Sequence, residues 1–179
     1  MKRLILLFLI VINVLFANIP EINLALQANN FDKALWFSQQ AFYSVDESNA
    51  EVYYYLGASY AGLKRDLLAE KAFDSFFERT FSLDQAYKVA EYYTENGRSD
   101  KATSAYEKIL EKYPNQKIAQ EEIGKLYFEQ EKYSETIKVL SEIIKDNEIK
   151  ANPLGYYVGI SYDNLKKYEN AEKYLKLAL

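Results

Sequence analysis

The side chains of this sequence that could take part in chemistry are mostly carboxylates and tyrosines. The chain has 26 Asp and Glu and 17 Tyr, but no His and no Cys. The lack of His removes the commonest general base and metal ligand, and the lack of Cys removes thiol nucleophiles, disulfides and zinc–thiolate sites. Glu107 and Glu111 stand beside Lys108 and Lys112, a pattern typical of charged residues on a solvated helix surface. The carboxylates are therefore interpreted as a charged surface.

The motifs that bind nucleotides or calcium, or that present a nucleophile, do not accompany these carboxylates. Gly124-Lys125 is too short to be a phosphate-binding loop, and the sequence has neither a calcium-binding loop nor a nucleophile elbow. Trp36 is interpreted as a core or interface aromatic residue rather than as a platform for a ligand. The sequence therefore predicts a protein that is not an enzyme and that has no cofactor and no metal site.

Small, aromatic and apolar residues recur in a pattern that indicates paired helices. A small residue is followed by Tyr after three positions, by Ala or Thr after nine more, and by a large apolar residue after four more. Repeats of this length indicate a solenoid of stacked units, each too small to bury its apolar side alone. The copies, which start 33, 34 and 35 residues apart, are Gly57/Tyr60/Ala69/Phe73, Ala90/Tyr93/Ala102/Tyr106, Gly124/Tyr127/Thr136/Leu140 and Gly159/Tyr162/Ala171/Leu175.

Each unit divides into two antiparallel helices. Gly57 and Ala69 belong where the two helices of one unit touch, since small residues let helix axes approach to about 8–10 Å. Tyr60 and Phe73 then fill the space between this unit and its neighbour. Asn96-Gly97 predicts the turn between two helices, because both residues tolerate left-handed backbone. The predicted boundaries are a partial repeat at 18–49 and repeats at 50–82, 83–116, 117–151 and 152–179.

The first seventeen residues have the layout of a secretory signal peptide. Lys2 and Arg3 precede an apolar run from Leu4 to Phe16, and the small residue Ala17 follows. The run is about 13 residues long, whereas a bilayer span needs roughly 20. We expect cleavage near Ala17, no stable membrane span after cleavage, and a periplasmic or secreted protein. An uncleaved anchor and a buried N-terminal helix are the alternatives.

The charge balance argues against nucleic acid as a partner. The formal net charge is −4, and removal of Lys2 and Arg3 would make it more negative. Binding to nucleic acid requires clustered Lys and Arg opposite the phosphates, and binding to anionic membranes requires a basic face. We therefore expect another protein or a peptide as the partner.

The helix pairs resemble tetratricopeptide repeats, whose consensus places an aromatic residue, Leu-Gly, Tyr, Ala, an aromatic residue and Pro in this order over 34 residues. The resemblance covers about residues 18–179. Ala86, Gln120 and Gly155 replace the leading aromatic residue, and only Pro114 fills the closing Pro position. The resemblance implies an all-α fold, a right-handed α–α superhelix of about four and a half helix-turn-helix repeats after an N-terminal signal peptide. The unit that matches best carries Tyr53, Leu56-Gly57, Tyr60, Ala69 and Phe73.

The resemblance also implies a concave face lined by the first helix of each unit. In this sequence the face mixes aromatic and acidic side chains, which favours a partner that is basic or that is recognised through aromatic residues. Tyr often anchors protein interfaces. A solvated acidic face, with tyrosines that only cover the core, is the alternative interpretation. The residues predicted to line this partner-binding groove are Tyr54, Tyr87, Glu91, Glu95, Glu121, Lys125, Phe128, Tyr156, Ile160 and Asp163.

The function implied by the resemblance is that of a non-catalytic periplasmic scaffold or adaptor, which binds a partner peptide or protein in the groove. One alternative is a self-assembly module that stacks through the C-terminal helix, where Tyr174, Leu175 and Ala178 would otherwise have one side exposed. A fragment of a longer repeat array would explain the same feature. Another alternative is an accessory domain of an envelope enzyme or of an outer-membrane assembly system.

Overall fold

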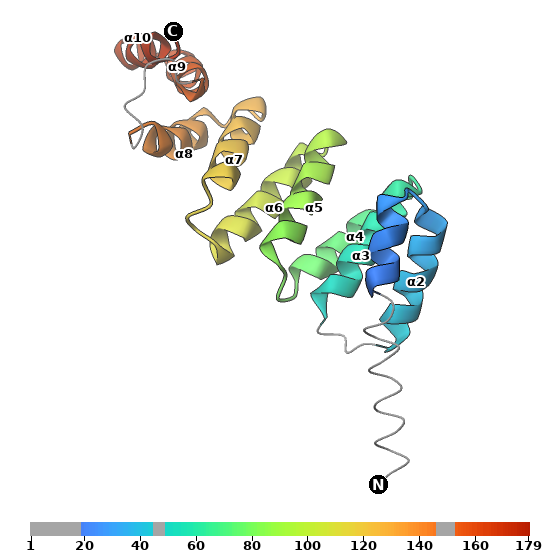
Figure 1. Ribbon diagram of the computed structural model, residues 1–179. Helices are drawn as coiled ribbons and strands as arrows, with labels where there is room; N and C mark the ends of the chain where they lie inside the picture. The colour runs from blue at the N-terminus through green and yellow to red at the C-terminus, as the bar shows by residue number, and fades with distance from the viewer. Residues whose placement is uncertain (1–18, 45–48, 146–152) are drawn as a thin grey trace, which may run out of the picture. The chain divides into compact units, whose positions relative to one another are not determined.

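The computed structural model describes residues 19–44, 49–145 and 153–179, and every regular element within these ranges is an α-helix (Figure 1). The predicted all-α class is confirmed. The predicted signal peptide, residues 1–17, lies outside the described ranges. After a helix over residues 19–27, the elements are α2 (Phe31–Ser44), α3 (Ala50–Gly62), α4 (Asp66–Phe77), α5 (Leu83–Glu95), α6 (Ser99–Lys112), α7 (Lys117–Glu129), α8 (Tyr133–Lys145), α9 (Leu154–Asn164) and α10 (Tyr168–Leu177).

The chain forms two compact units, the first ending at Gln85 and the second beginning at Ala86. The first unit holds the helix over residues 19–27 together with α2, α3, α4 and the start of α5. The second holds the rest of α5 and the helices from α6 to α10. As for membrane crossing, none of the helices in the described ranges is both long and apolar enough to do it.

A single type of backbone turn joins the two helices of each hairpin. One residue in every turn has a positive φ, between 53° and 66°. The residue after it donates its N–H to the carbonyl five positions earlier, as Arg65 does to Tyr60 at 2.9 Å and Arg98 does to Tyr93 at 2.8 Å. This bond is characteristic of the Schellman motif, which satisfies the last carbonyls of a helix. The residues with positive φ are Asn29, Lys64, Gly97, Glu131 and Lys166.

In the first unit, α3 and α4 approach so closely that only a glycine fits at Gly57. A Cβ atom added there would lie 2.3 Å from the ring of Phe73 in α4, well inside van der Waals contact. Small residues at a helix crossing allow this approach, as predicted for Gly57. Phe73 and Ala69 of α4 are both buried. The ring of Phe73 therefore fills the space that Gly57 leaves open.

Tyr55 of α3 forms a hydrogen bond to the helix over residues 19–27. Its side chain is buried, and its hydroxyl donates to Glu51 Oε1 at 3.0 Å while accepting from Asn23 Nδ2 at 2.9 Å. Tyr55 belongs to a core cluster with Ile22 and Leu35, which come from the two preceding helices. The helix over residues 19–27 is thus packed as part of the first unit.

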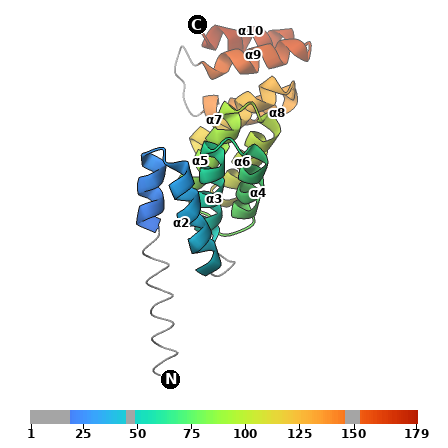
Figure 2. The same ribbon diagram turned by 90° about the vertical axis from the view of Figure 1, so that its right-hand side faces the viewer.

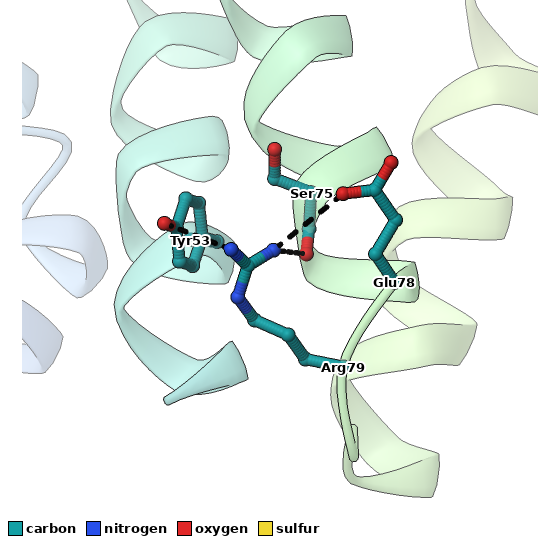
Figure 3. Close-up of polar contacts among 4 residues, drawn as sticks. All are labelled: Tyr53, Ser75, Glu78 and Arg79. Atoms are coloured by element: carbon teal, nitrogen blue, oxygen red, sulfur yellow. Dashed lines mark hydrogen bonds and ion pairs between the residues drawn. The ribbon is translucent and has the colours of Figure 1, made fainter. Parts of the chain in front are cut away.

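Arg79, just after α4, is held against the side of α3 (Figure 3). Its guanidinium carbon lies 3.9 Å from the centroid of the Tyr53 ring, and Nη2 donates to the Tyr53 hydroxyl at 3.0 Å. Nη1 donates to the backbone carbonyl of Ser75 and lies 3.7 Å from Glu78 Oε2. A planar guanidinium can stack and donate at once, whereas an ammonium cannot. Arg79 therefore fixes the segment that follows α4.

The second unit repeats the same packing. Added Cβ atoms would lie 2.2 Å from Leu140 at Gly124 and 2.6 Å from Leu175 at Gly159. Thr136 takes the place of the usual Ala, and its hydroxyl is satisfied within α8 by the Lys132 carbonyl at 3.1 Å. The pairs α7–α8 and α9–α10 are therefore closed by the large apolar residues that the sequence pattern predicts, Leu140 and Leu175.

Hydrogen bonds between side chains connect α6 with α7 and the residue that follows it within the second unit. The Tyr127 hydroxyl donates to Glu107 Oε1 at 2.9 Å, and Gln130 Nε2 donates to Thr103 Oγ1 at 2.9 Å. Both bonds connect residues at least twenty positions apart, so they link neighbouring repeats and not neighbouring turns of one helix.

We expect Gly57→Ala to destabilise the chain, although Ala is the better helix former by about 1 kcal/mol. Overpacking against the Phe73 ring should cost about 1–3 kcal/mol. Urea unfolding followed by circular dichroism measures the change. In the double variant Gly57→Ala/Phe73→Leu the smaller side chain makes room for the methyl group, so a double-mutant cycle should show favourable coupling. Equal stability of Gly57→Ala and the parent chain would contradict the close approach.

Arg79→Lys should lower the free energy of unfolding by about 1–2 kcal/mol, because the stacked, hydrogen-bonded guanidinium is lost while the charge remains. Tyr53→Phe keeps the ring and removes only the hydroxyl acceptor, so its effect should be smaller. Thermal unfolding of the two variants, compared at the same pH and salt concentration, gives the order. If Arg79→Lys matches the parent, the contact with Tyr53 contributes nothing to stability.

Candidate partner-binding face

The predicted groove residues divide between the two units. Tyr54 lies in the first unit, where its half-buried ring packs at 5.3 Å from Tyr55 and 6.0 Å from Phe76, centroid to centroid. The remaining predicted residues belong to α5, α7 and α9 of the second unit. The candidate face is therefore described within the second unit, and Tyr54 is described as part of the packing of the first.

Tyr87 of α5 takes part in packing more than in forming an open face. Its ring lies 6.4 Å from that of Tyr106 in α6, and its hydroxyl is shielded from solvent and faces the backbone amide of Ala119 near the start of α7. Burial raises the pKa of Tyr87, and the Ala119 amide opposes this shift. Tyr87 thus brings together α5, α6 and α7.

Glu91 and Glu95 of α5 are exposed and lie one helical turn apart. Glu91 also faces buried Tyr106, whose hydroxyl bonds with Thr94. Burial, followed by the nearby carboxylate of Glu122, raises the pKa of Tyr106 to about 12. The two glutamates therefore form an acidic edge over a buried tyrosine.

Lys125, the basic residue predicted for the groove, is already paired within α7. Its Nζ donates to Glu122 Oε1 at 2.7 Å, and both side chains are about one-third exposed. Burial alone would lower the pKa of Lys125, but Glu122, with a smaller effect of Glu121, raises it above its usual value. The positive charge of Lys125 is therefore largely offset by its own helix.

Aromatic side chains connect α7 with α9. The ring of Phe128 lies 5.2 Å from that of Tyr157, and Tyr157 lies 5.7 Å from Tyr156. Tyr156 is 50% exposed. Further along α9, Ile160 is half-buried and Asp163 is exposed. The second unit thus combines an aromatic cluster on α7 and α9 with exposed carboxylates on α5 and α9.

Sequence reasoning missed two residues of this face, Glu122 and Tyr157. Each directly follows a predicted residue, Glu121 or Tyr156. Glu122 forms the ion pair with Lys125, and the ring of Tyr157 packs against the rings of Phe128 and Tyr156. The presence of a second tyrosine after Tyr156 was the available signal. Successive residues of a helix point about 100° apart, so residues on the edge of a face are easily assigned to its flank.

The face offers carboxylates and partly exposed aromatic rings for contact with another molecule. Among the described residues, no group of three or more acidic side chains is placed to hold a metal ion. Carboxylates and aromatic rings can bind basic side chains through ion pairs and cation–π contacts.

Comparison with known families identifies the helix pair at the start of the second unit. Residues 86–115 match the model of the tetratricopeptide repeat. This part of the chain is similar to a tetratricopeptide repeat. This repeat spans most of α5 and all of α6, and it carries Tyr87, Glu91 and Glu95. The comparison with curated proteins gave no match.

Solved structures share the fold over most of the chain. A crystal structure of MamA has a TM-score of 0.70 at 17% identity, with 93% of this chain and 91% of that chain covered. YrrB, described as a TPR protein with an unusual peptide-binding site, has a TM-score of 0.67 at 20% identity, with 90% and 82% covered. PilF of Pseudomonas aeruginosa has a TM-score of 0.59 at 16% identity, with 94% and 76% covered. The predicted helical repeat fold of tetratricopeptide type is confirmed.

Alkaline pH should destabilise the chain through two tyrosines, the buried Tyr106 and the half-buried Tyr127. Burial and the bond to Glu107 raise the pKa of Tyr127 to about 12, and Tyr106 has a similar value, against 10.0 for an ordinary tyrosine. The folded chain keeps these protons where the unfolded chain loses them. The stabilisation is thus complete below pH 10 and is lost as the pH rises through about 12.

Urea unfolding at pH 9 and at pH 11 tests this dependence. Tyr127→Phe should reduce the loss of stability between the two pH values, and Tyr43→Phe, at a position that is 84% exposed, is the matched control. If the free energy of unfolding falls equally between pH 9 and pH 11 in the Tyr127→Phe variant and the parent, Tyr127 does not contribute to the pH dependence.

Proposed function

We propose that this chain is a non-catalytic interaction scaffold that binds a partner protein or peptide on the face formed by α5, α7 and α9. The observation that carries the proposal is the aromatic cluster made by Phe128, Tyr156 and Tyr157, together with the exposed carboxylates of α5 and α9. Partly exposed aromatic rings provide large contact areas at low entropic cost, and they often dominate interface energies. The tetratricopeptide fold supports the same role.

The partner should carry basic side chains next to an apolar or aromatic anchor. Glu91, Glu95 and Asp163 are exposed, and the positive charge of Lys125 is offset by Glu122. An acidic face of this kind attracts a basic segment during encounter and increases its association rate. The aromatic cluster then supplies the contact area that holds the segment. YrrB, which is structurally similar, is described as having a peptide-binding site, and this is consistent with a peptide as the partner.

The proposed location is the periplasm, after export and cleavage near Ala17. The support is the sequence itself, in which Lys2 and Arg3 precede an apolar run of the length typical of a signal peptide. An exported scaffold would bind its partner in the cell envelope.

Crosslinking of the chain in intact cells, followed by mass spectrometry, tests this function. Glu95→Lys reverses a charge on the candidate face and should reduce crosslinking to the partner by about fivefold or more. Glu111→Lys makes the same change at an exposed position on α6 and is the matched control. Tyr156→Ala should reduce crosslinking further, because it removes the half-exposed aromatic anchor.

Equal crosslinking of Glu95→Lys and the parent chain would remove the acidic face from the proposal. Equal losses in Glu95→Lys and Glu111→Lys would show an effect of net charge without a site. The same preparation yields the N-terminal peptide of the mature chain. A first residue near position 18 supports export with cleavage, and an intact Met1 contradicts cleavage near Ala17.

A further inference from the structure

The first and second helices of the three hairpins from α5 to α10 differ in charge. The first helices, α5, α7 and α9, carry seven carboxylates and three lysines, whereas α6, α8 and α10 carry seven carboxylates and seven lysines. The two helices of a hairpin lie side by side, as α9 and α10 do in Figure 2. The charged residues of the first helices are Asp84, Glu91, Glu95, Glu121, Glu122, Glu129 and Asp163, with Lys88, Lys117 and Lys125.

The charge balance of α6, α8 and α10 is typical of a solvated helix surface. Carboxylates and lysines pair along such a helix, as Glu172 and Lys176 do in α10. On α5, α7 and α9 the carboxylates outnumber the lysines, and like charges held on one scaffold repel each other. Positive charge from another molecule offsets this repulsion, so the candidate face is complementary to a cation.

Lys125 of α7 shows where a cation is held on this face. Its Nζ donates to Glu122 Oε1 at 2.7 Å, and both side chains are 32% exposed. Burial by itself lowers the pKa of Lys125, but the bond to Glu122 and the charges of neighbouring groups raise it above its ordinary value. These neighbours are Glu121 of α7 and Tyr157 of α9. Groups from two helices therefore favour a positive charge at this position.

The aromatic cluster of Phe128, Tyr156 and Tyr157 adjoins the position of this cation. Phe128 follows Lys125 by three residues, so the two side chains lie on the same side of α7. The ring of Tyr157 lies 5.2 Å from that of Phe128, and Tyr156 beside it is 50% exposed. A partner group bound near Lys125 would therefore also meet aromatic surface.

The pair of Glu122 and Lys125 is of a kind that exchanges readily. Partly exposed ion pairs three residues apart on a helix contribute little to stability, because two flexible side chains must be ordered to form them. The stem of a lysine is flexible, so Lys125 can turn into solvent when Glu122 takes another partner. A guanidinium donates to both oxygens of a carboxylate and stacks on aromatic rings, whereas an ammonium acts as a point charge.

We propose that an arginine side chain of the partner binds Glu122 in place of Lys125, next to the aromatic cluster. This subsite rests on the proposed function, because it lies on the same face. In the free chain Lys125 occupies the subsite, and it competes with the arginine for the carboxylate. A partner that presents an arginine without an apolar neighbour gains only the ion pair, so this competition favours partners that contact both Glu122 and the aromatic rings.

A fluorescein-labelled synthetic peptide with one arginine next to a phenylalanine is the probe for the subsite. The same peptide with citrulline, which has nearly the shape of arginine but no charge, is its control. In fluorescence anisotropy with the full chain, the arginine peptide should bind at least about fivefold more tightly than the citrulline peptide. Glu122→Gln should remove this difference. Glu111→Gln, at an exposed position of α6, should leave it unchanged.

Lys125→Met removes the competing ammonium and keeps a side chain of similar length. It should increase the affinity for the arginine peptide by about threefold or more, without a change for the citrulline peptide. Lys117→Met makes the same change in net charge at an exposed position of α7, and its effect should be less than about twofold. Circular dichroism verifies that each variant is folded.

Nuclear magnetic resonance follows the displacement of Lys125 directly. The side-chain nitrogen signal of Lys125 is identified by its loss in Lys125→Met. Addition of the arginine peptide should move this signal toward its position in Glu122→Gln, and addition of the citrulline peptide should leave it in place.

Equal gains of affinity in Lys125→Met and Lys117→Met would overturn the subsite, because they would show an effect of net charge alone. A Lys125 signal that the bound arginine peptide does not move would also overturn it. If the arginine peptide loses affinity in Tyr156→Ala but not in Glu122→Gln, the subsite is wrong and the proposed function stands. If neither the parent nor Lys125→Met binds the peptide, the subsite is again wrong, and the crosslinking of Glu95→Lys decides the proposed function independently.

Discussion

The close approach of the two helices in the pairs α3–α4, α7–α8 and α9–α10 is the constraint on which the packing of these hairpins depends. At Gly57, Gly124 and Gly159 there is no room for a Cβ atom, because Phe73, Leu140 or Leu175 of the second helix occupies that space. When a large side chain of one helix fills the space at a glycine of the other, it fixes both the register along the helix axes and the rotation of the two helices. Once a hairpin of the second unit has a single packing geometry, it presents a defined apolar side to the next hairpin of that unit, as in the buried cluster that α8 forms with α9.

The turns within the hairpins are the second feature that the repeats share. Only Gly97 is a glycine among the residues with positive φ, whereas Lys64, Glu131 and Lys166 adopt a conformation that disfavours a side chain by about 1–2 kcal/mol. Their backbone is held by the Schellman bonds to carbonyls such as those of Tyr60 and Tyr127. This turn satisfies the last carbonyls of the first helix within a few residues.

The sequence pattern was sufficient to predict the helix pairs, their spacing and the residues at each crossing, because these depend on size and on the 3.6-residue period. The partners of long side chains could not be predicted in the same way. Arg79 stacks on Tyr53, twenty-six positions away, and the Tyr87 hydroxyl turns toward α7. The pairing of Lys125 with Glu122 depends on which carboxylate lies nearest after packing. Helical periodicity gives the side of a helix, but the distances between helices decide such contacts.

The candidate face combines two interactions that act over different distances. Its carboxylates attract charge over a Debye length of about 8 Å at physiological salt, whereas its aromatic rings contribute only on contact, through buried apolar area. The half-exposed ring of Tyr156 packs edge to face on Tyr157, which packs in the same way on Phe128 of α7. Because two neighbouring repeats supply these rings, their alignment depends on the packing of α7 against α9, and a change that loosens this packing would also disrupt the aromatic cluster.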